Sequence, residues 1–198
     1  MVKILTVCTG NICRSPYAER YLQDGLDAVA PGRFEVRSAG TQALVGYPMD
    51  RRSAELLAEA GGSAHGFASR QLDERLLADA DFALALTTVH RDAIVARSPR
   101  MLKRAFTVRE FARVLRAVAA SDAGSLPRGS APDDVEARWK ALPKLASLRR
   151  HEARAAEPGV DDVVDPYRES SAVYARMVDE MLPALRDIVA FERAAARG

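Results

Sequence analysis

One short stretch near the N-terminus holds the residues best suited to chemistry, Val7-Cys8-Thr9-Gly10-Asn11-Ile12-Cys13-Arg14-Ser15-Pro16. Five residues separate Cys8 from Arg14, and Ser15 follows directly. A thiolate is a strong nucleophile. An arginine guanidinium is a planar fork that holds two oxygens of a phosphate at once, which lysine cannot do. The spacing Cys-x5-Arg-Ser therefore predicts a thiol nucleophile held beside a bound tetrahedral oxyanion.

The flanking segments predict a strand before this stretch and a helix after it. Residues 2–7 form a short, nearly continuous apolar run, which is typical of a central strand in a parallel sheet covered on both faces. Ser15 offers an N-cap oxygen and Pro16 a preset φ for the first helical turn. These features predict a helix over about residues 15–29, with the reactive loop between strand and helix.

The loop itself has the composition of an anion cradle. Gly10 and Asn11 can adopt the positive φ that a tight turn requires. Such a loop turns its N–H groups inward, and the positive end of the helix dipole adds to their field. The same field stabilises Cys8 as a thiolate. The residues expected to surround the anion are Thr9, Gly10, Asn11, Ile12, Cys13, Arg14 and Ser15.

The rest of the chain predicts an α/β fold. Three further strands are expected at residues 33–38, 81–86 and 105–108. Helices are expected at about residues 15–29, 51–60, from 88, 109–119, 133–154 and 171–196. This alternation predicts a single domain, residues 1–198, with a four-stranded parallel sheet and helices on both faces. The phosphate loop then lies between the first strand and the first helix.

Composition narrows the class of protein. The 198 residues carry a formal net charge of +2, which favours neither nucleic acid nor a membrane surface as partner. No segment is long and apolar enough for membrane insertion, and the N-terminal apolar run is too short for an export signal. Both cysteines lie in one loop, so a reactive thiol in a cytoplasmic protein is expected rather than a disulfide scaffold. No residues have metal-ligand spacing, so no metal and no cofactor are expected.

A second chemical signature lies far along the chain, at Asp161-Asp162-Val163-Val164-Asp165-Pro166-Tyr167. Pro166 biases Asp165 toward an extended backbone, so the carboxyl group is presented in a defined direction. Asp-Pro-Tyr alone is a common turn tripeptide. Its interpretation as a catalytic element depends on its pairing with the N-terminal loop.

The N-terminal stretch resembles that of the low-molecular-weight protein tyrosine phosphatases. This resemblance implies hydrolysis of phosphotyrosine in proteins, with inorganic phosphate as product. It implies that Cys8 is the nucleophile and forms a phosphocysteine, that Arg14 clamps the phosphate, and that Asp165 is the general acid. It further implies that Ser38 holds Asn11, while Ser15 lies near the sulfur.

The resemblance also marks places where the chain departs from the family. Leu44 stands where the family often has an aromatic rim residue, and Tyr47 is a candidate replacement beside Tyr167. Arg168 stands where a second tyrosine often follows. Phe67 occupies the position of a histidine that supports the phosphate loop. His65, two residues earlier, is either a substitute for that histidine or a surface residue.

The segment at about residues 120–160 is longer than the corresponding connection in typical relatives. Residues 121–124 are loop-like, and a charged helical stretch follows. Its basic residues are Arg138, Lys140, Lys144, Arg149 and Arg150. One interpretation is a basic rim that guides an anionic partner; the other, which we favour, is a solvated helix packed through Trp139 and Leu142. On the helix expected from residue 88, His90 is expected to be an exposed residue rather than a catalytic one.

Alternative functions share parts of this pattern. Thiol-linked arsenate reductases need later cysteines, and no cysteine follows Cys13. Protein arginine phosphatases resemble this loop except for a threonine where Ile12 stands, and a branched apolar side chain there favours a phenyl ring. A non-catalytic phosphate-binding module is the remaining alternative. Cys13 is a candidate redox partner of Cys8, because family members with this pair can form a protective disulfide; a small buried apolar role is the other interpretation.

Overall fold

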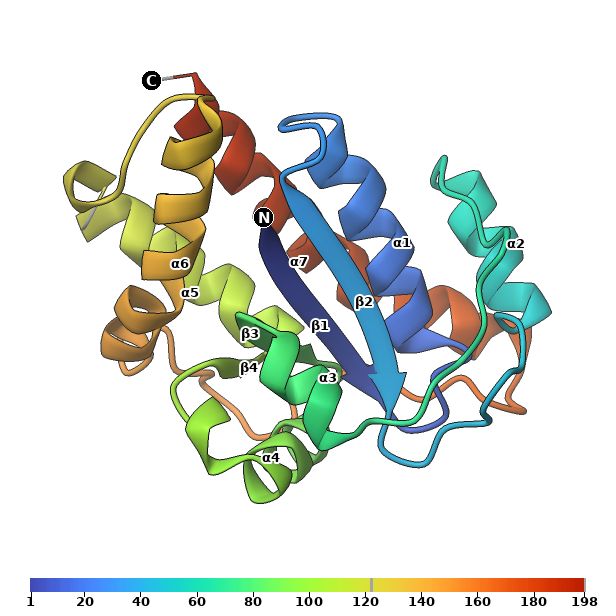
Figure 1. Ribbon diagram of the computed structural model, residues 1–198. Helices are drawn as coiled ribbons and strands as arrows, with labels where there is room; N and C mark the ends of the chain where they lie inside the picture. The colour runs from blue at the N-terminus through green and yellow to red at the C-terminus, as the bar shows by residue number, and fades with distance from the viewer. Residues whose placement is uncertain (122, 198) are drawn as a thin grey trace.

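The computed structural model describes residues 1–121 and 123–197; Asp122, within the expected loop at 121–124, and Gly198, within the expected domain, lie outside the described residues. Its four strands are β1 (Val2–Cys8), β2 (Phe34–Gly40), β3 (Phe82–Ala85) and β4 (Ala105–Thr107). All pairings are parallel, in the order β2-β1-β3-β4 (Figure 1). The apolar N-terminal run is therefore a central strand, and the predicted fold class is confirmed.

The helices follow the predicted alternation, with additions. They are α1 (Arg14–Asp27), α2 (Arg51–Glu59), α3 (Glu74–Asp79), α4 (Thr88–Arg97), α5 (Val108–Ser121), α6 (Pro132–Arg149) and α7 (Ser171–Ala196). Two 3₁₀ turns are η1 (Pro99–Met101) and η2 (Ala123–Ser125). The six-residue α3 was not predicted, because it is too short for a periodic pattern.

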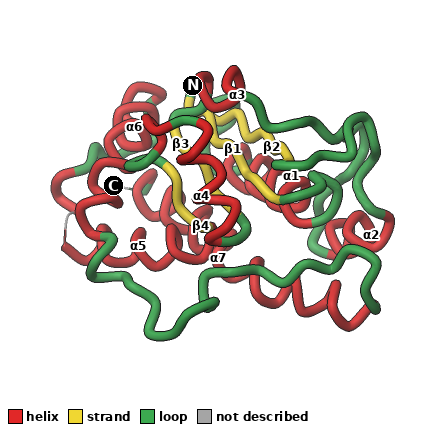
Figure 2. The backbone as a smooth tube through the Cα atoms, turned by 90° about the horizontal axis from the view of Figure 1, so that it is seen from below, coloured by secondary structure: helices red, strands yellow, loops and turns green. Residues whose placement is uncertain are grey.

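Both faces of the sheet are covered, as Figure 2 shows from below. Side chains of a strand alternate between faces, and the two sets enter different clusters. Val2 and Ile4 join the large core beneath α1, α5, α6 and α7, whereas Leu5 and Val7 join a smaller core with Leu77 of α3 and others. Small residues line the strands on this second face, namely Ala39, Ala83, Ala85 and Ala105.

A side chain of α1 pairs with part of the outer edge of β2. Gln23 accepts a hydrogen bond from the Val36 amide (2.7 Å) and donates one to the Phe34 carbonyl (3.1 Å). An unpaired edge strand is a template for association with another chain. Gln23 pairs two of the backbone groups on this edge from within the molecule.

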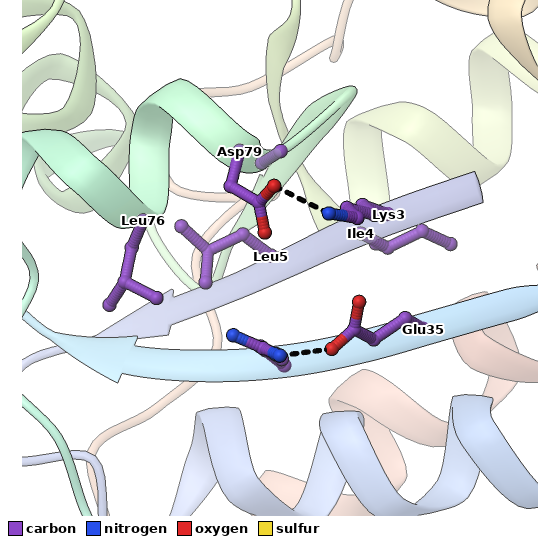
Figure 3. Close-up of a pocket in the computed structure, with 8 residues that line it drawn as sticks. Lys3, Ile4, Leu5, Glu35, Leu76 and Asp79 are labelled. Carbon is purple, nitrogen blue, oxygen red and sulfur yellow. Dashed lines mark hydrogen bonds and ion pairs between the residues drawn. The ribbon is translucent and has the colours of Figure 1, made fainter. Parts of the chain in front are cut away.

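A small pocket near the start of β1 and β2 is lined by charges that are already paired (Figure 3). Lys3 binds Asp79 of α3 at 2.5 Å, and Glu35 binds Arg37 on the same strand. Lys3 lies at the opposite end of β1 from Cys8. This pocket therefore has no connection with the reactive loop.

The sequence interpretation of Arg138 as part of a basic surface is wrong. Its guanidinium is fully buried and forms two hydrogen bonds with the equally buried Glu192 of α7, at 3.0 and 2.6 Å. Trp139 donates to the same carboxylate at 2.6 Å, and Arg138 also donates to the Pro127 carbonyl. The alternative interpretation, packing through the fully buried Trp139 and Leu142, is confirmed. Together these contacts fix α6 to α7.

Loss of one partner of this buried pair is expected to be costly. Glu192→Gln would leave the Arg138 charge without its counter-ion in the core, and the free energy of unfolding should fall by about 3–5 kcal/mol. Denaturation in urea measures this change. The matched control is Glu55→Gln, which removes an exposed pair with Arg51 and should change stability by less than about 1 kcal/mol. Equal effects of the two substitutions would contradict the structural role assigned to Glu192.

Candidate active site

The reactive loop runs from the end of β1 to the start of α1, at the lower edge of the sheet toward which the β2 arrow points (Figure 1). Four of its carbonyls accept hydrogen bonds from backbone amides of the segment after β2. The Thr41 amide donates to Cys8 (2.9 Å), Gln42 to Thr9 (3.0 Å), Leu44 to Gly10 (3.0 Å) and Asp50 to Ile12 (2.8 Å). Within the described chain, the amides of Gly10 to Cys13 donate to no protein group. Because the carbonyls are held outward, these amides are available to an anion.

Gly40 permits this close approach of the second segment. A Cβ atom at Gly40 would lie 2.4 Å from the Thr9 carbonyl oxygen, which is far inside van der Waals contact. The end of β2 and the reactive loop therefore touch through backbone alone.

Asn11 is the internal support of the loop. Its φ is 55°, in the left-handed region, whereas Gly10 does not use the positive φ that its residue type permits. Its side-chain oxygen accepts from the Arg70 amide at 2.7 Å, which fixes the orientation of the side-chain amide group. The nitrogen then donates to Ser15 (2.9 Å) and to Ser38 (2.8 Å). The structure thus brings Asn11 and Ser38 into contact.

Ser15 does not cap the helix as expected. α1 begins one residue earlier, and its N-cap, Cys13, makes no side-chain capping bond. The Ser15 hydroxyl lies instead 3.0 Å from the Cys8 sulfur. Because the hydroxyl oxygen already accepts from Asn11, its own proton is available for donation to the Cys8 sulfur.

A buried carboxylate that the sequence interpretation missed completes this network. Glu19 of α1 is 6% exposed and accepts a hydrogen bond from the Ser38 hydroxyl at 2.5 Å. Burial raises the pKa of Glu19. Its position four residues after Ser15 places it on the same helical face, which was the available signal.

The resemblance implied a histidine at position 67 that supports the phosphate loop, and this chain has Phe67 there. Phe67 is buried in the large core. His65 is exposed, and its backbone amide donates to the Ser63 hydroxyl. His65 is therefore the surface residue of the two interpretations.

Arg14 lies across the mouth of the loop and is only 3% exposed. It donates to the Val163 carbonyl (3.1 Å) and to the Asp165 carboxylate (2.7 Å). It also reaches the Thr9 hydroxyl at 3.5 Å. Residues separated by 151 positions in the chain are thus in direct contact.

The segment that carries Asp165 is anchored by backbone and ionic contacts. The Val163 amide donates to the Leu86 carbonyl at 2.9 Å, just beyond β3. Asp162 accepts from the Thr88 amide at 2.7 Å and so binds the N-terminus of α4. Asp161 pairs with Arg113 of α5 at 2.6 Å. Asp165 itself keeps a side chain that is 52% exposed, so its carboxylate faces the pocket and the solvent.

One pocket collects these groups. Its lining residues are Cys8, Thr9, Gly10, Ile12, Cys13, Arg14, Gln42, Leu44, Asp165 and Tyr167. Of the three rim candidates, Leu44 and Tyr167 line it. Tyr47 does not; it is 61% exposed, and its amide donates to the Leu44 carbonyl (3.1 Å) and to the Ser69 hydroxyl (3.0 Å).

Cys13 also lines the pocket, but its sulfur contacts a different set of residues from that of Cys8. It is 3% exposed, and its sulfur is 4.0 Å from the Tyr174 hydroxyl of α7. Burial raises the pKa of Cys13 to about 12. Cys13 is therefore a thiol at neutral pH, and neither cysteine is in a disulfide.

The expectation that His90 is exposed is wrong. His90 is 5% exposed, and its ring lies between the hydroxyls of Thr9 and Thr87. The prediction of a helix from residue 88 is confirmed, and Thr87 is its N-cap, since its hydroxyl accepts from the His90 amide. The sequence located the helix but gave no sign of which face the loop would cover.

The fold and site together define a class of protein, in which a strand, an anion loop and a helix present a thiol to a pocket that also contains Arg14 and Asp165. The family model for low molecular weight phosphotyrosine protein phosphatase matches residues 3–122, and the chain belongs to this family. The matched range contains Cys8 and Arg14. It ends before α6 and before the segment that carries Asp165.

Individual relatives support this family assignment. The chain is 40% identical over 98 residues to Etp of Escherichia coli K12, described as a low molecular weight protein-tyrosine-phosphatase, covering 50% of this chain and 63% of Etp. The matched part is thus less than two thirds of Etp. It is 38% identical over 109 residues to a protein-arginine-phosphatase of Geobacillus stearothermophilus, covering 55% of this chain and 70% of that protein.

A solved structure extends the likeness to the C-terminal half. The low molecular weight protein tyrosine phosphatase of T. tengcongensis superposes with a TM-score of 0.67 at 25% identity, covering 96% of this chain and 99% of that one. The segments outside the family match therefore belong to the same overall fold.

Two negative findings apply to the described residues. They contain no group of three or more His, Cys, Asp or Glu side chains arranged to hold a metal ion. No helix among them is both long and apolar enough to cross a membrane.

Proposed function

We propose that this protein hydrolyses phosphotyrosine in protein substrates and releases inorganic phosphate. The observation that carries this proposal is the convergence of Cys8, Arg14 and Asp165 on one pocket floored by unpaired loop amides. A reduced Cys8 is required, which fits a cytoplasmic protein.

In the first step, the Cys8 thiolate attacks phosphorus in line with the departing tyrosyl oxygen. A P–S bond forms as the P–O bond breaks, and the charge on the equatorial oxygens is stabilised by the loop amides and Arg14. Asp165, in its protonated form, gives its proton to the leaving phenolate. Before this, Arg14 must exchange its contact with Asp165 for phosphate oxygens, which releases the acid at the moment the substrate is bound.

In the second step, water attacks the phosphocysteine. Asp165, now ionised, accepts a proton from this water, the P–S bond breaks, and inorganic phosphate leaves with the Cys8 thiolate restored. The Ser15 hydroxyl, 3.0 Å from the sulfur, stabilises the thiolate as leaving group.

Ile12 favours phosphotyrosine over phosphoarginine. Its side chain lines the pocket, where it offers an apolar surface to a phenyl ring. A guanidinium group is polar and would lose hydrogen bonds to water against the same surface without gaining a partner. Leu44 and Tyr167 continue this apolar wall.

The test is a comparison of two peptides of the same sequence, one with phosphotyrosine and one with phosphoarginine. We expect a higher kcat/KM for phosphotyrosine, and Ile12→Thr should narrow the difference. A preference for phosphoarginine would favour the activity named for the Geobacillus relative. Failure to release phosphate from either peptide would favour a non-catalytic phosphate-binding module.

We also propose that Cys13 protects Cys8 during oxidation. Peroxide would convert the Cys8 thiolate to a sulfenic acid, and the Cys13 thiol would condense with it, forming a disulfide and releasing water. After peroxide and then a thiol reductant, the wild type should recover most of its activity and Cys13→Ser should recover little. Equal recovery of the two proteins would contradict the protective role.

A further inference from the structure

His90 is a buried titratable residue that the chemical steps do not use. It is the third residue of α4, and its ring bridges two threonine hydroxyls from different elements. Nδ1 is 2.8 Å from Oγ1 of Thr87, the N-cap of α4. Nε2 is 2.9 Å from Oγ1 of Thr9, which lies in the reactive loop and lines the pocket. The ring therefore connects the start of α4 to the anion site.

The donor and the acceptor in each hydrogen bond of the His90 ring can be assigned. Burial, reinforced by the nearby Arg14 guanidinium, lowers the pKa of His90 to about 4, so the ring is neutral at pH 7 and has one donor and one acceptor. Thr87 Oγ1 already accepts from the His90 amide at 3.2 Å, which leaves its own proton for Nδ1. On these grounds the ring proton is assigned to Nε2, which donates to Thr9.

Thr9 connects the His90 ring to the catalytic groups. Its hydroxyl oxygen accepts from His90 and, at 3.5 Å, from the Arg14 nitrogen that also binds Asp165. With its oxygen occupied by two donors, the hydroxyl proton of Thr9 is free to point into the pocket. The same oxygen therefore touches the guanidinium and faces the position of the anion.

We propose that His90 is a positioning residue, which holds the Thr9 hydroxyl so that it orients Arg14 and donates its proton to the bound phosphoryl group. This inference rests on the proposed phosphatase activity and adds a named contact to it. The α4 N-terminus is well suited to the role, because Asp162 binds the Thr88 amide there. One turn of helix thus touches both the anion loop and the segment of the general acid.

Displacement of Arg14 should affect the transition state more than the ground state. The loop amides remain to bind the substrate phosphate, whereas in-line transfer requires the guanidinium in a fixed orientation. We expect His90→Ala to lower kcat for an aryl phosphate by about tenfold or more, with a change in KM below about threefold. Thr9→Val should give a similar loss. The double variant should be no worse than either single one, because both act through the same contact.

Two amide substitutions separate positioning from packing. The terminal group of glutamine reaches the place of Nε2, whereas that of asparagine reaches only the place of Nδ1. His90→Gln should therefore regain much of kcat through Thr9, and His90→Asn should keep the Thr87 contact and the low kcat. A kcat for His90→Ala within twofold of wild type would overturn the proposal, and so would equal recovery by the Gln and Asn variants.

The matched control is Ile94→Ala, on the same helix. Ile94 is fully buried, but it packs in the smaller core with Leu77, away from the pocket. It should lower the thermal midpoint and leave kcat of the folded protein unchanged. If its kcat falls as much as that of His90→Ala, the effect is general to α4 and the proposal fails. Wild-type turnover is measured first, and its absence would refute the phosphatase activity rather than the contact.

Discussion

Turnover of an aryl phosphate is expected to fall by roughly 10⁵-fold or more in Cys8→Ser, on the scale seen when a nucleophile is removed from a hydrolase. A serine hydroxyl is not ionised at neutral pH, and neither the loop nor Ser15 supplies a base to remove its proton. The loop amides and Arg14 are unchanged by this substitution. Binding of inorganic phosphate should therefore persist within a few-fold of wild type, as measured by calorimetry.

This combination separates loss of chemistry from loss of structure. If Cys8→Ser neither hydrolyses the aryl phosphate nor binds phosphate, its loop is no longer folded, and the result does not test the nucleophile. Ser15→Ala, which keeps Cys8, then serves as the second variant. It should retain phosphate binding with a lower kcat because the thiolate loses one hydrogen bond. Substantial turnover by Cys8→Ser would contradict the assignment of Cys8 as nucleophile.

The second large effect is expected at Asp165. Asp165→Asn removes the proton that the leaving oxygen needs, and kcat for phenyl phosphate should fall by about 10²–10⁴-fold. Dinitrophenyl phosphate has a much more acidic leaving group, so the fall in kcat for this substrate should be smaller. A series of aryl phosphates with graded leaving groups measures this difference.

Glu169→Gln provides the matched control, because it removes an exposed carboxylate in the same segment. It should leave kcat near that of wild type for every leaving group. An equal loss for all leaving groups in Asp165→Asn would exclude the acid role. Such a result would instead indicate that the contact between Asp165 and Arg14 matters only for the position of the guanidinium.

The central elements of the fold could be predicted because their signals are local. The apolar run of β1, the Thr87 cap and the apolar stripe of α5 each specify an element within a few residues. Cys8 and Arg14 are fixed by one loop of set length. Asp165 was recognised only through resemblance, since no local signal shows that a loop more than 150 positions away returns to the pocket.

The errors concern which side chains are covered by distant parts of the chain. Arg138 follows a charged pattern, and its burial depends on Glu192, 54 residues away. His90 lies among polar neighbours, and its burial depends on the reactive loop covering the start of α4. Tyr47 was placed at the rim by sequence proximity, but the turn after Leu44 directs it to solvent. A polar residue on a helix is exposed by default, and only tertiary contacts overturn that expectation.

The most direct measurement is detection of the covalent intermediate. Wild-type protein is mixed with an excess of aryl phosphate, denatured during turnover, digested and examined by mass spectrometry. We expect a phosphoryl group on the peptide that contains Cys8, attached to its sulfur. A phosphoryl group on another residue, or turnover without any covalent species under conditions that trap one in a known phosphocysteine enzyme, would contradict the proposed mechanism.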